Sequence, residues 1–205
     1  MRLARRTTFA LVAMLALGFG LAAPAMAASP QAATSFIKTL GAEAISVLAD
    51  KSKTPADREA AFRTLFTQSF DIDAISQFVL GRYWRTATDA QRAEYQKLFQ
   101  EFIVSSYAAK LGQYSGEKFT VRDGRNDPDG TSVVPSQVER TDGGPPVRIE
   151  WRLTGPDNAP KIIDVVVEGV SMAVTHRSDF GSIIQNNGGK VEALLTSLKK
   201  RSGQG

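Results

Sequence analysis

The only histidine of the chain, His176, follows Ser171 by five residues, with Asp164 and Asp179 nearby in the sequence. Serine, histidine and a carboxylate are the groups of a hydrolytic triad. The stretch from Val170 to His176 is short and bounded by a glycine, which predicts a strand. Five strand residues span roughly 16 Å, and an odd offset puts two side chains on opposite faces. A hydrogen bond between Ser171 and His176 is therefore not expected, and the glycine pattern of a nucleophile elbow is missing.

Metal and nucleotide sites are equally unsupported by the sequence. One histidine and no cysteine leave only carboxylates as ligands, and the turn Asp127-Pro128-Asp129-Gly130 lacks the later ligands of a calcium loop. Neither a P-loop nor a glycine-rich dinucleotide motif is present. The lack of cysteine also excludes disulfides, thiolate nucleophiles and the acylated cysteine of a bacterial lipoprotein. The sequence predicts no catalytic group, no metal and no cofactor.

The first 27 residues are typical of a secretory signal peptide. Three arginines precede an apolar run from Phe9 to Ala23, and Ala25-Met26-Ala27 supplies a small-x-small cleavage pattern. At 15 residues, this run is shorter than the ~20 that span a bilayer. We therefore expect residues 1–27 to be a signal peptide and residues 28–205 to be a single domain that is free in solution outside the cytoplasm.

The charge balance gives no indication of a nucleic-acid partner. The chain has 25 Lys and Arg against 21 Asp and Glu. Three of those arginines lie in the leader, which has no acid, so 22 basic residues face 21 acidic ones in the mature chain. No basic stripe with interleaved aromatic residues is visible, and nucleic-acid binding is not predicted.

Capping residues indicate helices in the first half of the mature chain. Ser29-Pro30 opens a helix that reaches about Asp50, and Thr54-Pro55 opens the next. The segment Ile72 to Leu80 lies between a capping Asp71 and a terminal Gly81. Thr88 and Gln91 form a capping box ahead of a helix with one apolar face.

The second half changes to short β-branched runs separated by turn clusters. Short links favour antiparallel pairing, because a parallel crossover needs a dozen residues or more. A helix from Asp179 to Asn186 and a last helix ending at Lys199-Lys200-Arg201 should follow. Helices before strands predict an α+β fold, with N-terminal helices packed on a four- to five-stranded antiparallel sheet. The expected strands are Lys118–Asp123, Thr131–Arg140, Val147–Thr154, Lys161–Glu168 and Val170–His176.

Large apolar side chains are concentrated on one face of this sheet. In the run from Val147 to Leu153, apolar residues alternate with Arg148, Glu150 and Arg152. This alternation gives one apolar face and one wet face, and the helix from Tyr95 to Tyr107 is the natural cover. Periodicity alone does not distinguish a solid core from a hollow one, so both interpretations stay open at this point.

Several motifs in succession resemble the MlaC-like (toluene-tolerance) family of periplasmic phospholipid-binding proteins. They span nearly the whole mature chain in the order expected for that family. The residues that carry the resemblance are Phe70-Asp71-Ile72, Val79 to Trp84, Gln91-Arg92, Tyr95 to Phe99, Pro145 to Ile149, Trp151-Arg152, Asp164 to Met172, Arg177 to Phe180 and Gly188-Gly189.

The resemblance implies a periplasmic protein with an α+β fold of the NTF2-like type, which binds the acyl chains of a phospholipid between helices and sheet. It also implies a shuttle without enzymatic activity between an outer-membrane lipoprotein–porin complex and an inner-membrane ABC transporter complex with its substrate-binding subunit, acting in outer-membrane lipid asymmetry. Under this hypothesis the lipid-binding residues are Val79, Tyr83, Trp84, Phe99, Phe102, Ile103, Tyr107, Ile149, Trp151, Val170 and Met172.

Three alternatives remain. One is a related branch associated with hopanoid biosynthesis. Another is a small NTF2-like enzyme with Asp164 as a base, although alternation with Ile163 and Val165 favours the solvated face for Asp164. The third is an interaction module with a solid core.

Overall fold

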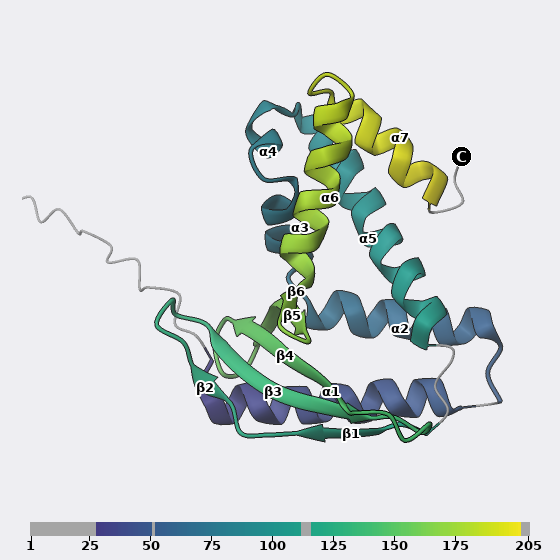
Figure 1. Cartoon of the computed structure of the whole chain (residues 1–205), viewed down its shortest axis with the longest axis vertical. Coiled ribbons are helices and arrows are strands. Elements are labelled where there is room, and N and C mark those ends of the chain that lie inside the picture. The colour runs from purple at the N-terminus through teal and green to yellow at the C-terminus, as the bar shows by residue number, and fades with distance from the viewer. Residues whose placement is uncertain (1–27, 51, 112–115, 202–205) are drawn as a thin grey trace, which may run out of the picture.

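The computed structural model describes residues 28–50, 52–111 and 116–201, so the expected signal peptide lies outside the described residues. Helices precede the sheet, and two more helices follow it (Figure 1). The helices are α1 (Pro30–Ala49), α2 (Pro55–Ser69), α3 (Ile72–Leu80), α4 (Tyr83–Thr86), α5 (Asp89–Leu111), α6 (Met172–Asn186) and α7 (Val191–Arg201).

Side-chain caps start the first helices where the sequence predicts them. Ser29 Oγ accepts a hydrogen bond from Ala32 N at the start of α1. At α2, Thr54 and Asp57 form a reciprocal capping box. Each cap satisfies backbone N–H groups that have no partner within the helix, which typically stabilises a helix by about 1 kcal/mol. The caps of α3 and α5 are also as predicted, with Asp71 accepting from Ala74 N and Thr88 accepting from Gln91 N.

One antiparallel sheet of six strands follows in the described residues, in the order β1-β3-β4-β5-β6, with β2 paired to β3. The α+β prediction is therefore confirmed. In the central register Val134 lies opposite Trp151, and Trp151 lies opposite Val165. The strands are β1 (Lys118–Val121), β2 (Arg125–Asn126), β3 (Ser132–Glu139), β4 (Val147–Thr154), β5 (Lys161–Val167) and β6 (Val170–Ser171).

The prediction of a strand from Val170 to His176 is wrong. Only Val170 and Ser171 pair with β5, and α6 begins at Met172. A tight turn precedes this change of direction, with positive φ at Glu168 (49°) and Gly169 (82°). Helix α4 and strand β2 were also not predicted, because both are only a few residues long.

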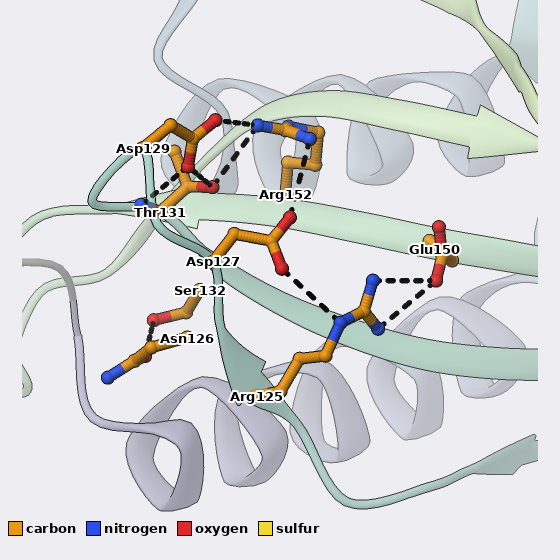
Figure 2. A network of polar contacts seen from close by, with 8 residues as sticks. All are labelled: Arg125, Asn126, Asp127, Asp129, Thr131, Ser132, Glu150 and Arg152. Carbon is orange, nitrogen blue, oxygen red and sulfur yellow. Dashed lines mark hydrogen bonds and ion pairs between the residues drawn. The ribbon is translucent and has the colours of Figure 1, made fainter.

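The two faces of the sheet differ in chemistry. Helix α1 packs on one face, where Ile37 is buried with Val134, Leu153 and Ile162. The opposite face carries charged side chains that pair with one another. Figure 2 shows this network near the β2–β3 turn, in which Arg125 contacts Asp127 and Glu150 while Arg152 contacts Asp127 and Asp129.

Candidate functional site

Two separate hydrophobic cores meet in this fold. One lies among the helices and includes Tyr95, Phe99 and Phe180, all of which are fully buried. The other lies between α1 and the sheet. Phe70, at the end of α2, packs against both cores.

A cavity of about 330 Å³ lies among residues of both cores, a volume within the usual range for a small-molecule site. Helices α1, α2, α3, α5 and α6 and strands β4 and β5 all contribute to its wall. The lining residues are Leu40, Ala44, Phe62, Leu65, Phe66, Phe70, Ile75, Phe99, Ile103, Tyr107, Ile149, Trp151, Ile163, Asp164, Val165, Val167, Met172, Ala173 and His176. Most of these side chains are hydrocarbon, so the space suits an apolar ligand.

Helix α2 lines the cavity with a row of aromatic rings. Phe62 and Phe66 lie four residues apart on one face of α2, and Phe70 follows at its C-cap in an extended conformation. The ring centroids of Phe62 and Phe66 are 6.3 Å apart, and those of Phe66 and Phe70 are 4.4 Å apart. Aromatic rings at such distances stabilise one another. The ring surfaces that are not in contact with another ring give the cavity an apolar wall.

The polar group of Trp151 is satisfied outside the cavity. Its Nε1 donates a 2.8 Å hydrogen bond to Ser136 Oγ on the neighbouring strand. Ser136 Oγ in turn donates to the carbonyl of Ile149 at 3.3 Å. The indole thus contributes apolar surface to the wall without leaving a buried N–H group unpaired.

The carboxylate of Asp164 is committed to capping α6. Oδ1 accepts from Ala173 N at 3.0 Å and from Val165 N at 2.8 Å, while Oδ2 accepts from Ser171 Oγ at 2.6 Å. Ser171 Oγ also accepts from Val174 N at 3.1 Å. Asp164 lies opposite Arg152 in the strand register, on the face that the alternation predicted, but it is half-buried and also lines the cavity. Its hydrogen bonds to three donors identify it as a structural cap.

His176 lies on the second turn of α6 among aromatic rings. Its ring centroid is 5.7 Å from that of Phe102 and 5.9 Å from that of Phe180. The hydroxyl of Ser171 donates to Asp164 and accepts from Val174 N, so it serves the helix cap. Because α6 begins at Met172, the extended strand predicted to separate Ser171 from His176 does not form. The capping role of Ser171 nevertheless agrees with the expectation that Ser171 does not act together with His176.

A family model described as "MlaC protein" matches residues 38–200. The chain belongs to the MlaC family. This match covers α1 from its third turn, the whole sheet and nearly all of α7. The resemblance inferred from the sequence motifs is thereby confirmed.

Two curated relatives are similar to this MlaC-family chain over part of its length. The intermembrane phospholipid transport system binding protein MlaC of Haemophilus influenzae is 26% identical over 129 residues, which cover 62% of this chain and 59% of that protein. The toluene tolerance protein ttg2D of Pseudomonas putida is 24% identical over 126 residues, which cover 61% and 58%. The chain thus spans about three fifths of the length of the curated relatives it matches.

A solved structure supports the fold. The phospholipid-binding protein from Ralstonia solanacearum, solved in complex with a phospholipid, superposes with a TM-score of 0.71 at 24% sequence identity. The superposition covers 84% of this chain and 97% of the other. A TM-score of this size over nearly the whole of the other chain establishes that the two proteins share one α+β fold.

Six of the eleven residues predicted to bind lipid lie in the cavity wall: Phe99, Ile103, Tyr107, Ile149, Trp151 and Met172. The remaining five lie outside the lining. Val79 is buried in the helical core, and Tyr83, Trp84 and Phe102 pack against that core. Val170 is 53% exposed on the surface. Contact with a ligand is untested for all eleven and stays a prediction.

The sequence interpretation missed the contribution of α2 and α1. Phe62, Leu65 and Phe66 lie on the helix predicted to begin at Thr54-Pro55 but were not assigned to a binding wall. The four-residue spacing of the phenylalanines marks an aromatic face on α2. Which way this face points is decided by the packing of α2 against α1 and α5, which the local sequence does not contain.

Two other features are absent from the described residues. No cluster of three or more His, Cys, Asp or Glu residues suitable for a metal occurs in this part of the chain. None of its helices is long and apolar enough to cross a membrane.

Proposed function

We propose that this MlaC-family protein is a periplasmic phospholipid carrier that moves lipid between an inner-membrane ABC transporter complex, through its substrate-binding subunit, and an outer-membrane lipoprotein–porin complex. In this role it would maintain outer-membrane lipid asymmetry without catalysis. The observation that carries the proposal is the hydrocarbon-lined cavity of about 330 Å³ between the helices and the sheet. The names of the relatives, which describe phospholipid transport and phospholipid binding, point the same way.

The energetics of lipid transfer explain why a cavity suffices. Each buried methylene is worth about 0.8 kcal/mol, so exposing two chains of roughly 16 carbons to water costs on the order of 25 kcal/mol. A protein that offers an apolar environment comparable to the bilayer removes most of this barrier. No reacting group is needed for such a function.

The size of the cavity bears on how the lipid is held. If a methylene is taken as similar in size to a water molecule, about 30 Å³, the cavity holds roughly eleven of them. This is less than one 16-carbon chain. By this comparison a complete acyl chain extends beyond the cavity, and we expect the head group to stay outside. The lining agrees with an external head group, because it includes Asp164 but no Lys or Arg among the described residues.

The test is to purify mature protein without removing lipid and identify the bound molecules by mass spectrometry. Phospholipid is expected, whereas a hopanoid would identify the related branch instead. Ala44 lines the cavity from α1, so Ala44→Phe should reduce the bound lipid several-fold by filling that space. Ala42 is exposed on the same helix, and Ala42→Phe should leave the bound lipid unchanged. Repeated preparations that contain no lipid would refute the proposal.

A further inference from the structure

The large apolar side chains exposed in the described residues are Phe78, Val170 and Val174, at 43%, 53% and 55%. All three belong to one region. Val170 precedes α6 and Val174 lies on its first turn, while Phe78 lies on α3, which packs directly against α6 (Figure 1). We call this region, together with Arg82 and Arg177, the α3–α6 patch.

Arg177 joins the two helices within the patch. Its guanidinium carbon lies 4.9 Å from the centroid of the Phe78 ring. On α6 it follows Val174 by three residues and so lies on the same helical face. A Cβ added to Gly81 would stand 3.0 Å from Arg177 Nε, so the side chain of Arg177 also reaches the end of α3, directly before Arg82.

The charges of the patch differ from those of the outer sheet face. On the sheet, Arg125, Arg148 and Arg152 each pair with a carboxylate. Arg82 and Arg177 have no carboxylate within 4.0 Å in the described part of the chain. Arg82 instead donates a 2.8 Å hydrogen bond to Tyr83 Oη. Positive charge beside exposed apolar groups is thus left without a partner at this site.

We propose that the α3–α6 patch docks the protein on the surface of an anionic lipid bilayer. At such a surface, apolar side chains enter the boundary between head groups and acyl chains while arginines stay level with the phosphates. The patch offers both groups side by side. Charge complementarity favours an anionic bilayer as the occupant, because Arg82 and Arg177, which form no ion pair within the described residues, can contact lipid phosphates beside the inserted apolar groups.

Helix α6 connects the patch to the cavity. Met172, Ala173 and His176 line the cavity, while Val174 and Arg177 face outward on the same turns. A bilayer in contact with the patch would therefore lie about one helix diameter, roughly 10 Å, from the cavity. The use of this proximity for lipid transfer rests on the proposed function, whereas docking itself does not.

The test is flotation of the mature protein with vesicles. We expect it to float with vesicles of phosphatidylglycerol and phosphatidylcholine mixed in equal parts, and not with phosphatidylcholine alone. Added salt should weaken the binding. Arg177→Gln should reduce partitioning about fivefold, and Phe78→Ser combined with Val174→Ser by at least about tenfold. Arg122→Gln, which removes a charge from the outer sheet face, is the matched control and should float like the wild type.

Two outcomes would overturn docking on a bilayer. One is flotation unaffected by the Phe78 and Val174 substitutions. The other is no flotation of the wild type with any vesicle, which would leave a protein as the occupant. Lipid bound to the same samples is measured by mass spectrometry. An empty cavity with intact flotation would refute the carrier proposal alone, and a filled cavity without flotation would refute docking alone. Circular dichroism confirms that each variant is folded.

Discussion

Trp151 on β4 donates a hydrogen bond from Nε1 to Ser136 Oγ on β3 at 2.8 Å. The two residues lie diagonally across adjacent strands, since Trp151 is opposite Val134 and Ser136 is opposite Ile149. This geometry turns the polar edge of the indole toward the sheet and leaves its carbon surface in the cavity wall. A large aromatic side chain can thus line an apolar space without an unsatisfied donor.

Removal of this acceptor should destabilise the protein. Ser136→Ala leaves the Trp151 N–H without its partner, at a cost of about 1–3 kcal/mol. Trp151→Phe removes the donor as well, so Ser136→Ala in that background should cost clearly less. Urea denaturation of the wild type, both single variants and the double variant measures the coupling. Equal costs of Ser136→Ala in the two backgrounds would show that the hydrogen bond contributes nothing.

The close approach of α1 to β1 should be sensitive to one methyl group. A Cβ at Gly41 would lie 2.4 Å and 2.6 Å from two ring carbons of Phe119. Phe119 makes an edge contact with Trp151, with ring centroids 6.3 Å apart. Gly41→Ala must therefore displace the Phe119 ring, and we expect a loss of about 1–3 kcal/mol in the free energy of unfolding.

The control for this substitution is another helical glycine. Gly181 in α6 has no atom within 4 Å of an added Cβ. Gly181→Ala should stabilise the protein by about 0.5–1 kcal/mol, because alanine loses less conformational entropy in a helix. Urea denaturation of both variants gives the comparison. A neutral or stabilising effect of Gly41→Ala would mean that Phe119 moves at no cost and is not wedged against α1.

The elements that the sequence predicted well are those whose signals are local. The helices α1, α2, α3 and α5 begin at caps that lie within three residues of the groups they bind. The start of α6 depends in addition on Asp164, seven residues before Ser171 on the preceding strand. That hydrogen bond forms only once β5 and β6 have paired. The local sequence does not contain this signal, so the β-branched residues after Gly169 have the pattern of a strand.

Predicted residues of α5 and β4 line the cavity, whereas α2 lines it without having been predicted and the predicted residues of α4 do not line it. Apolar spacing identifies which face of a helix is buried, but not what that face is buried against. Tyr83 and Trp84 have the composition expected of a binding wall, yet Trp84 packs beneath Arg92, whose Nε donates to the Trp84 carbonyl at 2.8 Å. This contact turns α4 toward the start of α5 and away from the cavity. Such placement depends on contacts between elements, which periodicity does not encode.

Asp164 provides a test between a cap and a catalytic base. Asp164→Ala removes the acceptor of the Ala173 N–H and Ser171 hydroxyl bonds, so we expect a loss of about 1–3 kcal/mol in stability. Folded protein should still contain its bound lipid, because the carboxylate is not needed to hold an acyl chain. Denaturation and mass spectrometry on the same preparations give both readings. Unchanged stability in Asp164→Ala would contradict the capping role.

The network in Figure 2 should make stability depend on pH in acid. The hydroxyl of Thr131 donates to Asp129 Oδ1 at 2.7 Å, and its backbone N–H donates at 3.1 Å. These bonds, with Arg152 nearby, hold the pKa of Asp129 below its ordinary value of 3.8. A carboxyl whose pKa is lower in the folded than in the unfolded state stabilises the fold above the unfolded value. That contribution is lost as the pH falls through the folded pKa.

Asp129→Asn should therefore be less stable than the wild type at neutral pH, and the difference should shrink below about pH 4. Thr131→Val removes the side-chain hydrogen bond that is the largest cause of the lowered pKa of Asp129. The difference in stability between the wild type and Thr131→Val should therefore also shrink in acid. Urea midpoints measured for the three proteins from neutral to strongly acidic pH give the test. A difference in urea midpoint between the wild type and Asp129→Asn that stays constant through this pH range would show that Asp129 has the same pKa in the folded and unfolded chains.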